Sequence, residues 1–201
     1  MRQSMIQHLK HLDTLLFLWI NQSLSNPVFD AVFVTITNGR FWIIPGILGA
    51  GLFIYFKKKQ ALIVVVLSLL TVSVSDPVCN RIIKPCFHRL RPCDNRVHID
   101  NGRFLLGRKS SASFPSSHAM NMFAQAMLFS LLYRKKKVVF IAFGFAFLIG
   151  FSRIYTGVHY PFDVLAGAFF GTLVGWMIYG LYALAKKMKP LRPPPLLGGG
   201  R

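Results

Sequence analysis

The stretch "SRIYTGVHYPFD", residues 152–163, lies between two of the most apolar runs of the chain. It contains three polar side chains, Arg153, His159 and Asp163, of kinds that a membrane-spanning segment normally excludes. Pro161 suits the first turn of a helix, so His159 directly precedes that helix and Asp163 lies within its first turn. The stretch therefore predicts a break between two membrane helices, with three functional groups gathered at the break.

The composition of the chain is that of a small integral membrane protein. Of its 201 residues, 53% are hydrophobic and 19 are Phe, which is more apolar than a soluble domain usually is. The 24 Lys and Arg face only six acids, all Asp, so the formal net charge is +18. Such a charge indicates an anionic partner: lipid, phosphate or nucleic acid. We disfavour nucleic acid because the basic residues gather at the ends of apolar runs.

The apolar runs predict an all-α fold, a polytopic transmembrane bundle of five to six membrane helices. Residues 1–37 remain open, because the apolar region Thr14–Thr37 is broken by "NQSLSNP" and fits either a kinked span or two short helices lying against the bundle. Residues 38–189 form the predicted membrane core, and residues 190–201 are expected to be a flexible tail outside it. Five of the predicted spans are Phe41–Phe56, Ala61–Val78, Ala119–Tyr133, Val138–Ile154 and Phe162–Ala185.

Three basic clusters predict the orientation of these spans. They are Lys57–Lys59, Arg134–Lys137 and Lys186–Lys189, and the positive-inside rule places all three in the cytoplasm. The loop of residues 80–117, called the outer loop below, then lies outside together with the break at residues 152–163. The outer loop nevertheless holds eight Lys or Arg between Arg81 and Lys109. This excess of cations outside the membrane predicts a bound anion.

Two further motifs fall at the same predicted membrane face. The first is "KPCFHRLRP", residues 84–92, which fits K-x6-R-P, and the second is "FPSSHAMN", residues 114–121. Together with S-R-x5-H-x3-D at residues 152–163, the three motifs resemble those of the type-2 phosphatidic acid phosphatases. This membrane family shares its core with acid phosphatases and vanadium haloperoxidases. One position departs from the family pattern, since Ser117 stands where P-S-G-H has glycine.

Residue chemistry alone indicates phosphate binding by these motifs. Arginine presents a planar fork that matches phosphate oxygens, and lysine adds a compact charge. We therefore predict that Lys84, Arg91 and Arg153, called the clamp below, hold a phosphate group. Ser116 and Ser117 open a helix whose first-turn N–H groups also bind anions.

The two histidines complete the predicted chemistry. Asp163 can accept the Nδ1–H of His159 and leave its Nε2 free to attack phosphorus. The resemblance implies the same roles: His159 as nucleophile through a phosphohistidine, Asp163 as its orienting group, and His118 as the general acid. The clamp supplies the positive charge, so we expect no metal and no cofactor. Cys86 and Cys93 could pair in an oxidising compartment, but we expect free thiols.

The resemblance implies a lipid phosphatase of the bacterial inner membrane whose site faces the periplasm, acting on a lipid partner, with no protein partner indicated. Candidate substrates are lipid A 1-phosphate, undecaprenyl pyrophosphate and phosphatidylglycerol phosphate. The alternatives are a non-catalytic anionic-lipid binder or transporter and, ranked last, a haloperoxidase-like enzyme. Four further residues are possible headgroup contacts: Arg81, His88, Arg89 and Arg96.

Overall fold

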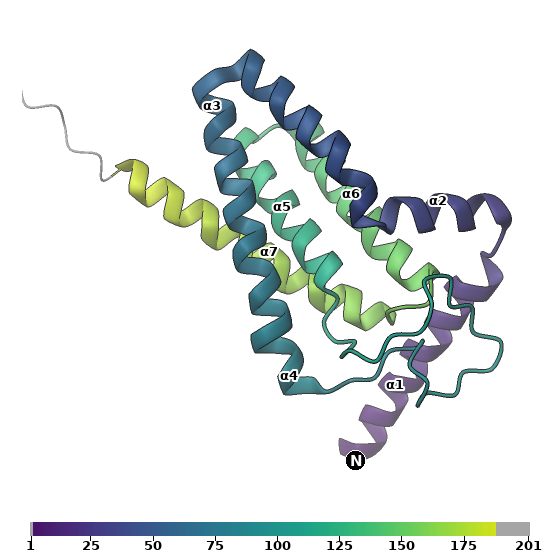
Figure 1. Ribbon diagram of the computed structural model, residues 1–201. Helices are drawn as coiled ribbons and strands as arrows, with labels where there is room; N and C mark the ends of the chain where they lie inside the picture. Colours follow the sequence, from purple (N-terminus) through teal and green to yellow (C-terminus); the bar gives the residue numbers. More distant parts are fainter. Residues whose placement is uncertain (1, 188–201) are drawn as a thin grey trace, which may run out of the picture.

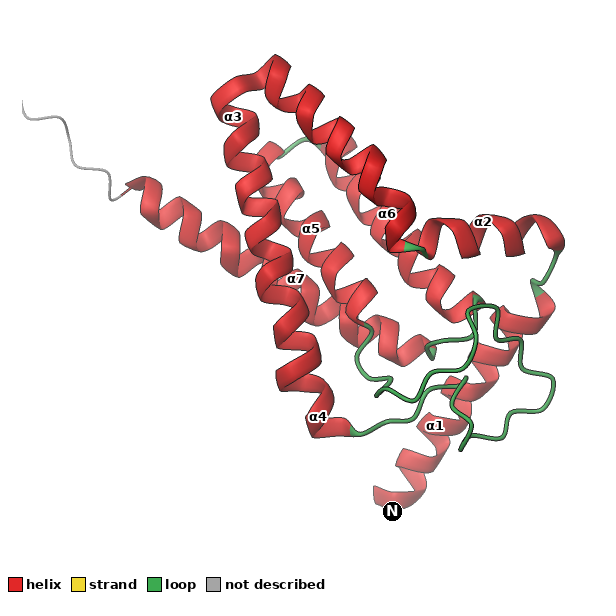
Figure 2. Ribbon diagram, in the orientation of Figure 1, coloured by secondary structure: helices red, strands yellow, loops and turns green. Residues whose placement is uncertain are grey.

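The computed structural model describes residues 2–187, and within them every regular element is helical (Figure 2). This confirms the predicted all-α fold. The predicted tail, residues 190–201, lies outside the described residues. In chain order the elements are α1 (Arg2–Leu18), η1 (Trp19–Ser23), α2 (Pro27–Thr37), η2 (Gly39–Trp42), α3 (Ile43–Pro77), η3 (Val78–Ile83), α4 (Lys84–Phe87), α5 (Ser117–Tyr133), α6 (Lys136–Tyr155) and α7 (Pro161–Lys187).

Three helical stretches of the described chain are long and apolar enough to cross a bilayer: Gly39–Phe87, Lys136–Tyr155 and Pro161–Lys187. The first holds two of the predicted spans, because α3 folds back on itself at Lys58, where φ is 46° and ψ is −122°. Figure 1 shows the two arms meeting at this bend. The remaining predicted span corresponds to α5, whose 17 residues make it shorter than a typical membrane helix.

The N-terminal region forms helix α1, continued by η1, and a separate helix α2. Helix α2 begins after Asn26, whose side chain accepts the N–H of Phe29 at 2.9 Å, and Pro27 occupies its first turn. Helix α1 packs against α7, and α2 packs against α6. Both therefore lie beside the bundle near its break at residues 152–163 (Figure 1).

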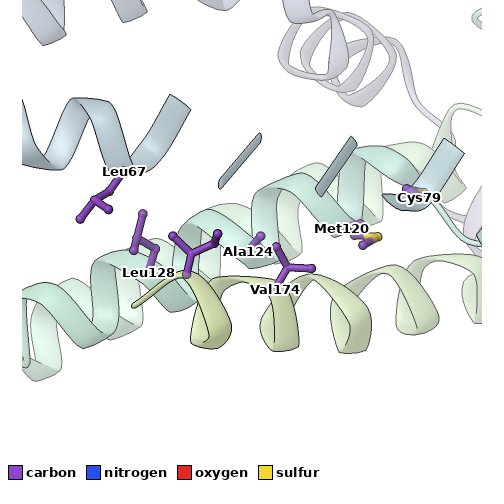
Figure 3. Close-up of a cluster of buried hydrophobic side chains, with 7 residues drawn as sticks. Leu67, Cys79, Met120, Ala124, Leu128 and Val174 are labelled. Atoms are coloured by element: carbon purple, nitrogen blue, oxygen red, sulfur yellow. The ribbon is translucent and has the colours of Figure 1, made fainter. Parts of the chain in front are cut away.

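Close contact between α5 and α7 forms the centre of the bundle. Three glycines of α7, at positions 167, 171 and 175, face the backbone of α5. A Cβ atom on Gly171 would lie 2.1 Å from the carbonyl oxygen of Met120, so only glycine fits there. Small residues at this four-residue spacing let membrane helices approach closely. A cluster of buried side chains, including Leu67 of α3, Leu128 of α5 and Val174 of α7, extends this contact (Figure 3).

The turns and loops separate to the two ends of the bundle. The bend of α3 at Lys58 and the turn at Arg134 between α5 and α6 lie at one end (Figure 1). The long loop after α4 lies at the other end, beside α1 (Figure 1). The predicted outer loop is partly helical, because η3 and α4 continue α3 as far as Phe87, and its irregular part is residues 88–116.

Candidate active site

Residues 88–116 bring the three motifs together by folding back over the ends of α6 and α7. The N–H of Ser113 donates to the carbonyl of Arg89 at 2.7 Å, which closes the loop on itself. The N–H of Ser116 then donates to the carbonyl of Asp163 at 2.9 Å, which joins the second motif to the third. Arg91 of the first motif donates to the carbonyl of Val158 at 3.1 Å. Motifs far apart in sequence thus share one site.

The His159 side chain lies at the centre of this site, buried, with a defined environment for each ring nitrogen. Its Nε2 atom is 2.9 Å from a terminal nitrogen of Arg91, and its Nδ1 atom is 3.4 Å from Oδ2 of Asp163. Arginine can only donate, so Nε2 is the acceptor of this pair and the ring proton sits on Nδ1, toward Asp163. This is the tautomer in which Nε2 carries the free lone pair. Gly157 makes the preceding turn with φ of 83°, where a Cβ atom would clash with the backbone of Arg103.

The carboxylate of Asp163 is held on both of its oxygens. Its Oδ2 atom accepts the N–H of Tyr160 at 2.9 Å and also the hydroxyl of Ser113. Its Oδ1 atom accepts from a terminal nitrogen of Arg89 at 2.9 Å. The side chain is fully buried. The orientation of the carboxylate toward His159 is therefore fixed by four donors, counting the imidazole.

The clamp residues are buried, and two of them have unused hydrogen-bond capacity. Arg91 also bonds to the carbonyl of Ser111 at 2.9 Å. Arg153 donates to the hydroxyl of Thr37 at 2.8 Å, but its Nε atom is buried and has no partner within the described chain. The Lys84 ammonium likewise has no hydrogen-bond or ion-pair partner in the part of the chain that the structure describes, although the residue is only 8% exposed. Such groups suit an anionic ligand.

His118 lies in the first turn of α5, in the electrostatic field of the same cations. Its imidazole is partly buried, and the charges of Arg153, Lys109 and Arg91 act on it. Ser116 is the N-cap of α5, and its side chain accepts the N–H of Ala119 at 3.5 Å. Ser117 is the first helical residue, where N–H groups have no carbonyl partner within the helix. The serine in place of the family glycine therefore simply begins a helix, with no positive φ to strain it.

The four possible headgroup contacts are placed differently from one another. Arg81 and His88 are exposed at the end of the bundle that carries the site. Arg89 points inward and bonds to two carboxylates, those of Asp163 and Asp13. Arg96 pairs with Asp94 of its own loop at 2.8 Å. For Arg89 and Arg96 the structure thus shows internal ion pairs, while contact with a headgroup stays a prediction for all four.

Several residues at the site carry no sequence motif that would reveal them. The hydroxyl of Ser113 donates to Asp163, and the hydroxyl of Thr37 accepts from Arg153. Neither residue belongs to a recognisable motif. Lys109 was one cation among eight, and partial desolvation together with the charges of Arg153 and Arg91 lowers its pKa. Asp13 lies on α1, and only its rarity in a basic chain could have drawn attention to it.

The cysteines and acids of the described chain form no metal-ligand cluster. All three cysteines are free thiols, including Cys86 and Cys93. Within residues 2–187 there is no group of three or more His, Cys, Asp or Glu side chains that could hold a metal ion. The cations at the site include the clamp and Arg89.

An apolar cavity of about 810 Å³ lies within the bundle, between both arms of α3, α5 and α6. Its lining on α5 includes Met122, Gln125 and Phe129. These residues follow His118 at intervals of four, three and four, which places all of them on one helical face. The cavity therefore lies along the same face of α5 as the histidine of the second motif.

Burial lowers the pKa of His159 from 6.5 to about 3, with Arg91 and Arg153 acting in the same direction and Asp163 opposing them. The histidine of the unfolded chain binds a proton near pH 6.5, so acid favours unfolding. The contribution of the neutral His159 imidazole to the free energy of unfolding is fully present above about pH 6.5, and it is lost as the pH falls toward 3.

We expect His159→Gln to remove this part of the acid sensitivity. When the pH is lowered from about 7 to about 4, the melting temperature of the wild type in detergent should fall further than that of the variant. The difference between the two drops should be on the order of 5 °C or more. The exposed His98 provides the control, and His98→Gln should keep the wild-type pH dependence. Parallel curves for His159→Gln and the wild type would contradict a buried neutral imidazole.

Comparisons with known proteins agree on one family. The sequence model described as the PAP2 superfamily matches residues 61–187. The chain is similar to a lipid A 4'-phosphatase of Bacteroides thetaiotaomicron, with 33% identity over 98% of this chain and 88% of the relative. A lipid A 4'-phosphatase of Porphyromonas gingivalis is 30% identical over 90% of this chain and 77% of its own. Among solved structures, a transmembrane phosphatidylglycerolphosphate phosphatase of Bacillus subtilis is similar, with a TM-score of 0.66 and 29% identity over 92% of this chain and 90% of that one.

Proposed function

The chain belongs to the PAP2 superfamily and is an integral membrane lipid phosphatase, and from this premise we propose that it removes a phosphate from lipid A through a phosphohistidine on His159. The observation that carries this proposal is the environment of His159. One ring nitrogen faces Asp163, and the other lies 2.9 Å from an arginine of the clamp. A phosphate bound there meets a neutral nucleophile and several cations at once.

In the proposed first step, Lys84, Arg91 and Arg153 bind the phosphate oxygens. Arg91 exchanges its bond to His159 for one to the phosphate, which frees Nε2. The Nε2 lone pair attacks phosphorus, and the bond from phosphorus to the lipid oxygen breaks. His118 donates a proton to this leaving oxygen. Asp163 stabilises the positive charge that develops on the His159 ring.

In the proposed second step, water hydrolyses the phosphohistidine. His118, now without its proton, accepts one from the water as the water oxygen attacks phosphorus. The bond from phosphorus to Nε2 breaks, inorganic phosphate leaves and His159 returns to its starting tautomer. The cations stabilise the charge on the phosphoryl oxygens in both steps.

Lipid A is the substrate that we favour, because two relatives that match most of this chain are named lipid A 4'-phosphatases. The 4'-phosphate thereby replaces the 1-phosphate as the preferred position. The apolar cavity of about 810 Å³ could receive an acyl chain while the phosphate reaches the clamp. The many cations of the outer loop suit a headgroup of high negative charge.

We further propose that the protein resides in the bacterial inner membrane with its site toward the periplasm. The basic turns around Lys58 and Arg134 lie at the end of the bundle opposite to the site (Figure 1). The positive-inside rule then places the site outside the cytoplasm.

Phosphate release from purified enzyme in detergent tests this function. The substrates are lipid A, undecaprenyl pyrophosphate and phosphatidylglycerol phosphate at matched detergent concentration. We expect the highest kcat/KM with lipid A and loss of its 4'-phosphate. Because the clamp supplies the charge, EDTA should leave the rate within about twofold of its untreated value. A preference of tenfold or more for either other lipid would contradict the substrate assignment, and strong inhibition by EDTA would contradict the metal-independent mechanism.

A further inference from the structure

A chain of charged side chains links the proposed nucleophile to α1, the N-terminal helix. Asp163 contacts His159 through Oδ2 and accepts from Arg89 through Oδ1 at 2.9 Å. The other terminal nitrogen of the Arg89 guanidinium donates to Oδ2 of Asp13 at 2.6 Å. The guanidinium therefore bridges two carboxylates, one at the reacting centre and one on α1.

Asp13 is also held by the backbone of α7. Its side chain is fully buried, and its Oδ1 atom accepts the N–H of Phe162 at 2.9 Å, in the first turn of α7. Arg89 also lies over the ring of Tyr160, with 4.2 Å between the guanidinium carbon and the ring centroid. Phe17 of α1 packs edge-on against the same ring, with 5.6 Å between centroids. Helix α1 is thus fixed to the segment that carries His159 by an ion pair, a hydrogen bond and aromatic packing.

Charge balance gives Asp13 a specific role. A lone guanidinium beside Asp163 would draw the carboxylate charge toward itself and weaken its hold on the Nδ1–H of His159. Asp13 shares that guanidinium and neutralises it, since the three groups carry two negative charges and one positive. The Asp163 carboxylate then keeps enough negative charge to support the imidazole as Nε2 attacks.

We propose that Asp13 is a positioning residue for the phosphatase reaction, which acts through Arg89 on Asp163 and hence on the basicity and orientation of His159. This inference rests on the proposed function of His159. It makes α1 part of the catalytic unit, although α1 lies before the region that the family model matches. Asp13 touches neither the proposed phosphate nor the reacting nitrogen.

Asp13→Asn tests this role because asparagine keeps an oxygen for the N–H of Phe162 but removes both the charge and the oxygen that accepts from Arg89. We expect kcat with lipid A to fall about 10- to 100-fold while KM stays within about threefold. Arg89→Gln should have a similar effect. The double variant should lose little more activity than either single variant, because each of these changes breaks the same chain of contacts from Asp13 through Arg89 to Asp163.

Asp30→Asn is the matched control. Asp30 lies on α2 and pairs with Arg103 of the outer loop, so it also ties an N-terminal helix to that loop. It does not contact Asp163, and Asp30→Asn should lower stability yet keep kcat within about threefold. An Asp13→Asn variant with kcat within threefold of the wild type, or an Asp30→Asn variant that loses as much activity, would overturn the proposal.

Vanadate gives a second readout that needs no turnover. It forms a bond with a nucleophile in place of phosphorus, whereas inorganic phosphate is only held by the clamp. In thermal-shift titrations, Asp13→Asn should weaken vanadate binding about tenfold and phosphate binding at most about twofold. Equal weakening of both anions would indicate a merely structural role for Asp13. A wild type that binds vanadate but hydrolyses no lipid would instead refute the proposed function, with the role of Asp13 still measured by the titration.

Discussion

Replacing His159 by alanine should lower kcat for lipid phosphate by about 10⁴-fold or more, because the variant has no atom that can form the bond to phosphorus. The clamp and His118 remain, so binding of the substrate should change much less than turnover. KM is therefore expected to stay within about fivefold of the wild-type value. The measurement is phosphate release under initial-rate conditions, with the folded state checked by thermal unfolding in detergent.

His98→Ala provides the control for this variant. His98 is a histidine of the outer loop whose side chain is 95% exposed, and its loss should leave kcat within about twofold of the wild type. A folded His159→Ala enzyme that keeps a tenth of the wild-type kcat would refute His159 as the nucleophile. His118 would then be the other imidazole to test.

A second large effect is expected from Gly171→Ala, this time on stability. The added Cβ atom would lie 2.1 Å from the carbonyl oxygen of Met120 and 2.9 Å from its carbonyl carbon. Both are backbone atoms of α5, so no side chain can rotate away and the two helices must separate. Overpacking of this kind costs about 3 kcal/mol or more. Since α5 carries His118 and α7 carries Asp163, activity should fall with stability.

Gly180→Ala on the same helix is the matched control. Beyond its own stretch of helix backbone, a Cβ atom at Gly180 would meet no atom within 4 Å, and alanine favours the helix over glycine by about 1 kcal/mol. Thermal unfolding of both variants in the same detergent makes the comparison. We expect a lower melting temperature for Gly171→Ala and an equal or higher one for Gly180→Ala. Equal melting temperatures would contradict the close contact between α5 and α7.

The sequence was sufficient to predict the fold class and the gathering of the three motifs. Long apolar runs form membrane helices whatever their partners, because the backbone must satisfy its hydrogen bonds internally. The basic clusters predict an orientation of the runs, and that prediction alone placed His118 and His159 at one face. The glycines of α7 at positions 167, 171 and 175 also form a four-residue repeat that is visible in the sequence.

Contacts that depend on the exact path of the chain could not be predicted in this way. Nothing in the sequence of α1 indicates that Asp13 meets Arg89, since 76 positions separate them. Its place in a basic loop makes Arg89 only a possible headgroup contact, and the folded loop shows its two carboxylate partners. Thr37 and Ser113 are single hydroxyl residues without a motif, so their bonds to the site follow from tertiary structure alone.

Direct detection of the phosphohistidine tests the central proposal most sharply. The wild-type enzyme is mixed briefly with lipid A labelled in its phosphate, quenched in alkali to preserve the bond from nitrogen to phosphorus, and digested for peptide mass spectrometry. We predict one phosphoryl group on the peptide that contains His159, at the position of that residue, and none on the same peptide of His159→Ala. Label on His118 or on Ser113 in the wild type, or turnover without any label on His159, would contradict the mechanism.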